Sequence, residues 1–248
     1  MRAKKEGQAL RTEPRQARSL ASVARILHAA RTVLEHDGFQ GLTTNRIAKE
    51  ANVDIATLYQ YFASKEAILY TLAEQWIESV HTLYARHAAA LHEPTPMLES
   101  LRAIRRDFDA MPDTQWNWTH LAPVMPIVPV LAQLEAEHEA RTARFWMAWL
   151  RRYGVEWEAD RLEAFARMLY VQADSAMTLA GRLPPGQADW VRRWSRRQVV
   201  SLLRTCFPRS RRPQAARLSS PGESPSLSKR ISARGRAVKS NPAPEKRQ

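Results

Sequence analysis

The chain has 248 residues, of which 44% are hydrophobic and 25% are charged, and its formal net charge is +13. The excess positive charge lies in residues 1–18 and 207–248, because residues 19–206 hold 21 Lys/Arg against 21 Asp/Glu. This length allows a small domain followed by a larger one, and the basic ends suit a polyanionic partner but leave the function of the middle open.

The single cysteine, Cys206, excludes an internal disulfide framework and a cysteine-rich zinc site. Such cysteine usage is typical of a reducing compartment, so we expect a cytoplasmic protein and a Cys206 that acts as a small buried hydrophobe near a helix end. The basic N-terminus is not followed by the apolar run of a secretory signal. The most apolar stretch, residues 121–132, contains three prolines and is too short to span a bilayer, so we expect a buried loop there and no membrane partner.

Apolar residues recur at intervals of three and four between Arg18 and Phe207, while strand signals are scarce, which predicts an all-α fold. The first helix is expected to end at the segment HDGFQG, where Gly38 suits a left-handed cap. Either Thr43 or Thr44 is expected to cap a second, short helix.

A third helix is expected from Ile55 to about Phe62, after the short turn NVD. Asn52 occupies a turn position that needs a positive φ, which asparagine tolerates best after glycine. Asp54 is expected to cap this helix through its first amides. Ser64 is expected to cap a long helix from Lys65 to about Leu91.

Proline and glycine delimit the later helices, which we expect at about 96–111, 114–122, 129–153, 158–181 and 187–206. From residue 208 onward the chain is rich in Ser, Pro and Arg. Such a composition predicts a disordered basic tail over 208–248, which is either a solvated extension or a sequence-independent clamp on phosphates.

Two short helices joined by a three-residue turn predict a helix-turn-helix, whose second helix can enter the roughly 12 Å wide major groove of DNA. Leu58 and Phe62 lie one helical turn apart and are expected to face the core. The side chains then expected to point largely outward are Ile55, Ala56, Thr57, Tyr59, Gln60 and Tyr61. Tyrosine hydroxyls can bond phosphate oxygens, Gln60 can bond a base edge, and Lys65 adds a positive charge.

The stretch from about Arg18 to Leu72 resembles the N-terminal DNA-binding domain of TetR-type (TetR/AcrR) transcriptional repressors. The matching parts are a helix before a GF turn, a helix with the pattern TT..IA..A.V, and above all TLYQYF.SKE. The resemblance implies contacts with the DNA backbone from Thr43 or Thr44, Ala56, Tyr59, Tyr61 and Lys65, and contacts nearer the bases from Ile55, Thr57 and Gln60. Two departures are Asn52, where glycine is usual in the family, and the segment DIA at 54–56, where Ser-x-Gly is more typical.

The same resemblance implies the organisation of the whole chain. It would comprise a basic arm (1–17), a helix-turn-helix domain (18–65), a larger helical ligand-binding and dimerisation domain (66–207) and the tail (208–248). The chain would form a homodimer through the helices at about 158–181 and 187–206. As a repressor, this dimer would bind a palindromic operator in double-stranded DNA, and a small-molecule effector would release it. No cofactor is expected. Helical spacing is consistent with close packing of the first of these helices, against a second subunit or within the chain's own core, through Leu162, Phe165, Ala166, Leu169, Ala173, Ala176 and Ala180.

Aromatic residues gather in the segments MPDTQWNWTH and RFWMAWLRRY. By composition alone such residues are more often plain core than a pocket for an apolar or aromatic ligand. Because the resemblance implies a pocket, we take as its candidate lining Phe108, Met111, Trp116, Trp118, His120, Met125, Phe145, Trp146 and Trp149.

Two other functions are compatible with parts of the sequence. The pairs Glu78/His81 and Glu135/His138 have the spacing used by metal-dependent helical-bundle enzymes, but the charged neighbours of His138 predict a solvated helix face. No HExxH, phosphate-binding glycine loop or nucleophile elbow is found, so we expect neither a metal site nor catalytic residues. A sequence-nonspecific architectural DNA-binding protein would use the basic ends and bind with a steep salt dependence, whereas the helix-turn-helix favours a specific regulator.

Overall fold

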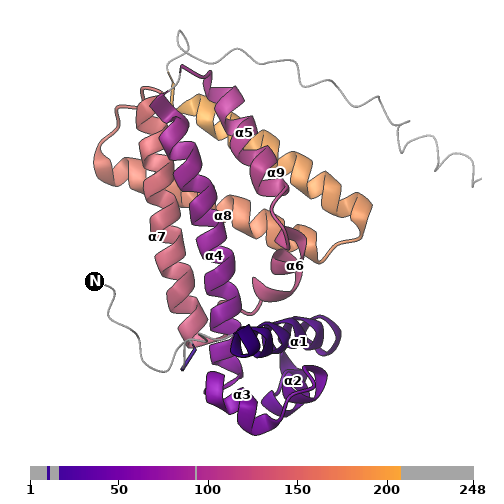
Figure 1. The fold of residues 1–248 in the computed structure, drawn as a ribbon. Helices are drawn as coiled ribbons and strands as arrows, with labels where there is room; N and C mark the ends of the chain where they lie inside the picture. Colours follow the sequence, from indigo (N-terminus) through magenta and orange to yellow (C-terminus); the bar gives the residue numbers. More distant parts are fainter. Residues whose placement is uncertain (1–9, 12–16, 93, 208–248) are drawn as a thin grey trace, which may run out of the picture. The chain divides into compact units, whose positions relative to one another are not determined.

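The structure, a computed structural model, describes residues 10–11, 17–92 and 94–207 (Figure 1). In these ranges every regular element is a helix, which confirms the predicted all-α fold. The predicted tail at 208–248 and most of the predicted arm at 1–17 lie outside the described residues.

The N-terminal helices are α1 (Ala17–Gly41), α2 (Thr44–Glu50) and α3 (Ile55–Tyr61), followed by the long helix α4 (Lys65–Ala89). Gly38 has a φ of 67° and joins two helical pieces of α1, so the expected break in the helix occurs at this glycine. Arg11 lies near this group, because its backbone N–H donates to the Tyr61 carbonyl at 2.8 Å.

Capping side chains set the boundaries of these helices as the sequence predicted. Thr43, rather than Thr44, caps α2, because its hydroxyl accepts from the Arg46 N–H at 3.2 Å. Asp54 accepts from the Ala56 N–H at 2.7 Å, and Ser64 accepts from the Ala67 N–H at 3.3 Å. Each cap satisfies an amide that has no carbonyl partner within its own helix.

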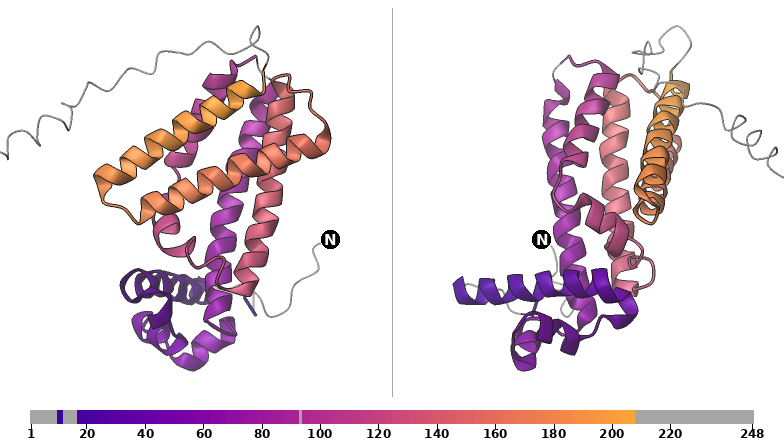
Figure 2. Two further views of the ribbon diagram at one scale, coloured as in Figure 1. Left: turned by 180° about the vertical axis from the view of Figure 1, so that it is seen from behind. Right: turned by 90° about the vertical axis from the view of Figure 1, so that its right-hand side faces the viewer.

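The remaining elements are η1 (Ala90–His92), α5 (Met97–Asp109), α6 (Thr114–Trp116), η2 (Asn117–Leu121), α7 (Pro129–Arg152), α8 (Ala159–Gly181) and α9 (Pro185–Thr205). Their bounds agree with the predicted ranges within a few residues, except that 114–122 is divided into a short α-helix and the π-helical turn η2. Helices α4 and α7 run side by side, and α8 packs on both α7 and α9 (Figures 1 and 2).

Two buried clusters hold these helices together. The first lies beneath α3 and joins α1–α4 to the segment after η2 and to the start of α7, through residues such as Ile26, Val124 and Leu131. The buried loop predicted at 121–132 is buried only in part, because Pro126, Ile127 and Pro129 are exposed, Ile127 to 64%, and residues 129–132 already belong to α7. The second cluster joins α4, α5, α7, α8 and α9 around the fully buried Trp149.

Most of the α8 residues that were predicted to pack closely face the core of the same chain. Leu162, Ala166, Leu169 and Ala180 are buried within the chain, which favours the intrachain alternative for this side of the helix. Cys206 is buried at the end of α9, as predicted. None of the described helices has the length and apolar character needed to cross a bilayer.

Candidate functional sites

Helix α3 has one buried side and one exposed side. Leu58 and Phe62 are fully buried, as predicted, whereas Ala56, Tyr59 and Gln60 are exposed. Ile55 and Thr57 are half-buried at the edge of the exposed side. The helix therefore presents a mixed polar and aromatic surface, which has the composition needed to contact both phosphates and bases.

Tyr61 does not belong to this surface. Its side chain is only 6% exposed, so the expectation that it points outward is wrong. The physical reason is helical spacing, because Tyr61 follows Leu58 by three positions and therefore shares its inward face.

The side chains around α3 are tied to neighbouring helices. The hydroxyl groups of Tyr59 and Thr44 lie 3.1 Å apart, which links α3 to the start of α2. Thr43 is exposed beside them while it caps α2. The ammonium group of Lys65 lies 4.4 Å from the centre of the Phe39 ring, at the N-terminus of α4. Its positive charge is thus held near backbone amides that attract anions.

A polar hollow of about 440 Å³ lies between α3 and the start of α1. Arg18 and Arg25 line it from α1, and Thr57 and Gln60 line it from α3. These arginines are not among the DNA-contacting residues predicted from the sequence. Their spacing of seven residues, two helical turns on one face, is the signal that could have identified them.

The turn before α3 also follows the sequence prediction. Asn52 has a φ of 50°, so this asparagine adopts the left-handed conformation expected of it. Asp54 directs its carboxylate to the first amides of α3. Its negative charge is therefore used at the helix N-terminus, where it is favourable.

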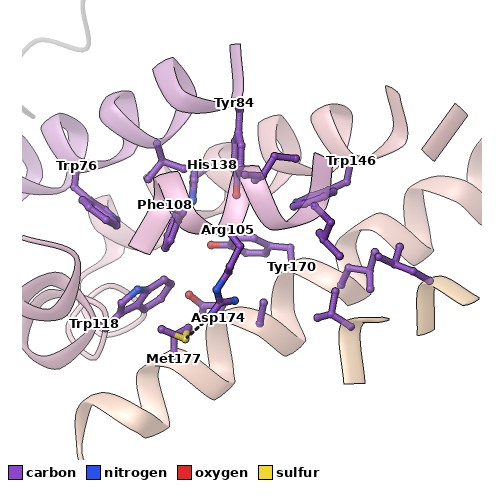
Figure 3. Close-up of a pocket in the computed structure, with 17 residues that line it drawn as sticks. Trp76, Tyr84, Arg105, Phe108, Trp118, His138, Trp146, Tyr170, Asp174 and Met177 are labelled. Carbon is purple, nitrogen blue, oxygen red and sulfur yellow. Dashed lines mark hydrogen bonds between the residues drawn. The ribbon is translucent and has the colours of Figure 1, made fainter. Parts of the chain in front are cut away.

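A second site is a cavity of about 130 Å³ among the C-terminal helices (Figure 3). Its wall receives side chains from α4, α5, α7, α8, α9 and the turn η2. The aromatic part of the wall consists of Trp76, Tyr84, Phe108, Trp118, Trp146 and Tyr170. A mostly apolar, concave wall with few polar groups is typical of small-molecule sites.

The candidate lining residues divide between the cavity and other places. Phe108, Trp118 and Trp146 line the cavity, and Met125 lines a smaller cavity of about 30 Å³ beside it. Met111 and Trp116 instead line a separate hollow of about 220 Å³ that also contacts α1.

Three further candidates do not line any of these spaces. Phe145 and Trp149 belong to the core, because they lie on the side of α7 that packs inside the second cluster. The Trp149 indole N–H donates to the Ser100 hydroxyl at 3.0 Å. His120 lies against the ring of Trp116, with 5.6 Å between the ring centres.

Several residues of α4, α5 and α8 line the cavity but are not among the lining residues predicted from the sequence. Trp76 and Tyr84 are isolated in sequence, but they lie eight residues apart and so near one face of α4. Tyr170 is an aromatic residue outside the two aromatic-rich segments, and Arg105 and Asp174 are charged, so clustering of aromatic residues in the sequence does not indicate them.

His138 contradicts the expectation of a solvated helix face. It is buried, and its Nδ1 lies 3.0 Å from Nε2 of His81 on α4. The reason is again periodicity, because His138 shares a face of α7 with the buried residues Leu134 and Thr142. Burial and the neighbouring His81 lower the pKa of His138 to about 3, so the His138 ring is neutral near pH 7.

The two Glu-x-x-His pairs therefore meet through their histidines, but their glutamates have other partners. Glu78 forms an ion pair of 2.5 Å with Arg141, and Glu135 accepts a hydrogen bond from the Tyr170 hydroxyl. Among the described residues, no group of three or more His, Cys, Asp or Glu side chains could hold a metal ion. The arrangement is thus a buried polar contact between α4 and α7.

Burial also raises the pKa values of the acidic residues at the cavity. The pKa of Asp174 is raised to about 7 by burial and by the charge of Glu135. Burial likewise raises the pKa of Glu135, although the hydrogen bond from Tyr170 opposes this shift. Near neutral pH, the Asp174 carboxyl is therefore divided between its charged and neutral forms.

The segment from Asp113 to Leu121 lies between the cavity and α1. Trp118 of this segment lines the cavity, whereas Asp113 pairs with Arg31 of α1 at 2.5 Å. The Arg31 guanidinium also lies 4.4 Å from the centre of the Trp116 ring. A displacement of Trp118 at the cavity wall could therefore be transmitted to α1 through the contacts of Asp113 and Trp116 with Arg31.

Comparison with known proteins identifies the N-terminal region. Residues 26–71 match the family described as "Bacterial regulatory proteins, tetR family". The HTH-type transcriptional regulator UidR of Escherichia coli (strain K12) is 29% identical over 83 residues, which cover 34% of this chain and 42% of that protein. An uncharacterized HTH-type transcriptional regulator in the dhlA 5' region of Xanthobacter autotrophicus is 31% identical over 67 residues, which cover 27% of this chain and 33% of that protein. The chain thus spans less than half the length of these relatives.

Solved structures share the fold over a longer range. The crystal structure of Thermus thermophilus FadR, a TetR-family transcriptional repressor in complex with lauroyl-CoA, covers 81% of this chain and 100% of its own, with a TM-score of 0.54 and 23% identity. A TetR-family transcriptional regulator from Streptomyces coelicolor covers 75% of this chain and 90% of its own, with a TM-score of 0.57 and 23% identity. These matches confirm the fold predicted from the sequence, and the family match of residues 26–71 confirms the resemblance of the N-terminal domain.

Proposed function

Because residues 26–71 match the tetR family of bacterial regulatory proteins, we propose that the chain is a regulator of this family and acts on transcription as a homodimer bound to a palindromic DNA operator. The observation that carries this proposal is the exposed side of α3, where Tyr59 and Gln60 project while Leu58 and Phe62 anchor the helix from behind. A helix of this kind can lie in the major groove with its outer side chains against the bases.

In the proposed complex, different side chains have different roles. Gln60, Ile55 and Thr57 contact base edges, because they lie on the outer or edge positions of α3. Tyr59, Lys65, Ala56 and the threonines Thr43 and Thr44 contact the sugar-phosphate backbone. Arg18 and Arg25, which line the hollow beside Gln60, add phosphate contacts from α1.

Helices α8 and α9 provide the proposed dimer surface. Five of the eight exposed large hydrophobic side chains in the described residues lie on these two helices, and they are Met168, Val171, Leu179, Trp190 and Trp194. The α8 members are spaced by three and eight residues, so they lie near one side of the helix, away from its buried face. Two such helix pairs can form a four-helix bundle around a two-fold axis.

The cavity is the proposed effector site. The FadR structure, which shares this fold, holds lauroyl-CoA, so a helical domain of this type can take a ligand. A ligand that binds against Trp118 would shift the segment from Asp113 to Leu121, and Arg31 would carry that shift to α1. Release of DNA requires that the ligand bind more tightly to the state with low DNA affinity.

In vitro selection of DNA sequences with the purified full chain tests this function. We expect a dyad-symmetric consensus with half-sites about one helical turn, roughly 34–36 Å, apart. Binding that falls steeply with salt and yields no consensus would instead support a sequence-nonspecific architectural protein and overturn the proposal.

A further inference from the structure

The wall of the cavity contains carboxyl groups whose charge is not balanced within it. Asp174 of α8 lines both the main cavity and the smaller one beside it, and Glu135 of α7 lines the smaller one. Within the described part of the chain, neither a hydrogen bond nor an ion pair engages the Asp174 carboxyl. An unpaired carboxylate in an apolar site is costly, so a ligand that supplies a partner would be stabilised there.

Aromatic rings surround this acidic part of the wall. Figure 3 shows Trp76, Phe108 and Trp118 grouped on one side of the cavity, next to Asp174. Trp76 and Phe108 meet edge to face, with 6.0 Å between their ring centres. The faces of aromatic rings carry negative potential and attract cations as well as flat apolar groups.

The other charged group of the wall, Arg105, already has a partner. Its Nε donates to the Asp109 carboxylate at 3.3 Å, and a second nitrogen lies 3.8 Å from the Met177 sulfur. Asp109 also pairs with Arg196 at 3.2 Å. No ion pair joins Arg105 to Asp174 in the described structure, so the guanidinium does not neutralise the acid that faces the cavity.

We propose that this cavity binds an organic cation, in which a protonated amine donates to Asp174 while a flat aromatic or apolar body lies among Trp76, Phe108 and Trp118. This inference rests on the proposed function and names the ligand class of the same cavity. A volume of about 130 Å³ admits on the order of ten water molecules, which is room for a body of one or two fused rings. The lauroyl-CoA bound in the FadR structure does not define the ligand class of this cavity, because that class depends on the residues of this cavity wall.

The binding of such a cation should depend on pH with a defined sign. In the empty cavity the pKa of Asp174 is about 7, because of burial and Glu135. An ammonium group stabilises the carboxylate and lowers this pKa, so binding releases a proton, and affinity rises from about pH 6 to about pH 8. The other titratable groups at these two cavities are Glu135 and His138 of α7, Tyr170 of α8, Arg105 of α5 and Tyr84 of α4.

Calorimetric titration of the full chain with three matched probes tests the proposal. The probes are the naphthylmethylammonium ion, the neutral naphthylmethanol and the anionic naphthoate. At pH 7.5 we expect the ammonium ion to bind about tenfold or more tightly than the alcohol, because the ammonium is a charged donor that also neutralises the Asp174 carboxylate, whereas the alcohol is a neutral donor. Asp174→Asn should lower ammonium affinity to near that of the alcohol.

Asp160→Asn is the matched control, because it removes an exposed acid of the same helix that does not line the cavity. It should keep the wild-type preference, and titrations in buffers of different ionisation enthalpy should show proton release with the ammonium ion only. Equal or tighter binding of the alcohol or the naphthoate, or an unchanged preference in Asp174→Asn, would overturn the ligand class. Operator binding by the wild-type chain without a probe is measured separately, so that failure of the regulatory function can be distinguished from failure of this inference.

Discussion

Gln60 and Lys65 lie close in sequence, but in the proposed complex they would make two different kinds of DNA contact. Gln60 is exposed on α3, and its amide can both donate to and accept from a base edge. Lys65 starts α4 beside the Phe39 ring and offers a positive charge without directional selectivity. Gln60 should therefore contribute to sequence specificity, and Lys65 should contribute to affinity for any DNA duplex.

Alanine variants of these positions should separate the two roles. Gln60→Ala should reduce discrimination at particular base pairs by about 1–3 kcal/mol, because a base-edge contact is lost. Lys65→Ala and Tyr59→Ala should weaken binding to all sequences, and Lys65→Ala should reduce the salt slope by about one. Gel shifts with the selected operator and its single-base variants measure these effects. If both backbone variants bind like the wild type, the assigned contacts are wrong.

His138 makes the stability of the C-terminal domain sensitive to acid. Its pKa is lowered to about 3 in the folded chain by burial and by His81, against an ordinary value near 6.5. The unfolded chain therefore binds a proton on this ring at a higher pH than the folded chain does. The contribution of His138 is fully present above about pH 6.5 and is lost as the pH falls toward the folded value.

We therefore expect the free energy of unfolding of the wild type to decrease as the pH is lowered from about 6.5. His138→Gln should be less stable at pH 7.5, because it disturbs the contact with His81, but its stability should change less with pH. Urea denaturation between pH 4 and 8, roughly the range in which histidine titrates, measures this slope. The exposed His36→Gln serves as the control and should retain the wild-type slope. An unchanged slope in His138→Gln would contradict the assignment.

At the scale of the helix, α8 and the π-helical turn η2 approach each other closely at Gly181. A Cβ atom at this position would lie 3.0 Å from the Trp118 carbonyl oxygen and 3.1 Å from the Thr119 Cα. These neighbours are backbone atoms, so the contact cannot be relieved by a side-chain rotation. Gly181 thus allows α8 to hold the segment that carries Trp118 into the cavity wall.

Gly181→Ala should lower the free energy of unfolding by about 1–3 kcal/mol, because the helix and the turn must separate. Gly186→Ala, in the first turn of α9, is the matched control, since a Cβ there has nothing within 4 Å. It should be neutral or stabilise by up to about 1 kcal/mol, because alanine is the better helix former. Thermal denaturation of both variants checks the contrast, and equal stability of the two would show that the contact at Gly181 is not tight.

The sequence predicted local features of these helices better than the orientation of their faces. Gly38, Thr43, Asp54 and Ser64 mark helix ends as expected, because caps depend on the residue type and its immediate neighbours. The exposed side of α3 was also predicted except at Tyr61. A phenol that is equally suited to surface and core does not reveal its environment by its identity alone.

Only part of the cavity lining was predicted from the sequence. Phe108, Trp118 and Trp146 were found because aromatic residues cluster in their segments. Asp174 and His138 were not, because their roles arise from helices that are distant in sequence and meet only in the folded chain. The charged residues next to His138 in sequence suggested an exposed helix face, whereas its spacing of four residues from Leu134 indicates the buried face of α7.

At the scale of the whole molecule, the proposed recognition of a palindromic operator would need two copies of α3, one from each subunit. The exposed hydrophobic residues of α8 and α9 offer the surface for this pairing, with Trp190 and Trp194 on α9 as its largest members. Their rings lie 5.7 Å apart, so they form one continuous apolar area. Such an area on a single subunit favours association with a second copy.

Trp194→Glu should convert the dimer into a monomer and lower operator affinity by at least about tenfold, because a buried charge opposes pairing. Sedimentation velocity measures the assembly and gel shifts measure the affinity. Ile127→Glu is the control, because it places the same charge on an exposed apolar residue that lies outside α8 and α9. A Trp194→Glu variant that remains dimeric would exclude this residue from the interface.

The central claim is that the exposed side of α3 lies against DNA, and cleavage by a tethered iron chelate tests it most directly. The chelate is attached to Ala56→Cys, an exposed position of α3, in a Cys206→Ala background, with Ala148→Cys, an exposed position of α7, as the matched control. We predict that the α3 conjugate cuts the selected operator at two symmetric positions about one helical turn apart, and that the α7 conjugate cuts it weakly and without pattern. Equal cleavage by both conjugates, or none from α3 while the operator is bound, would contradict the account.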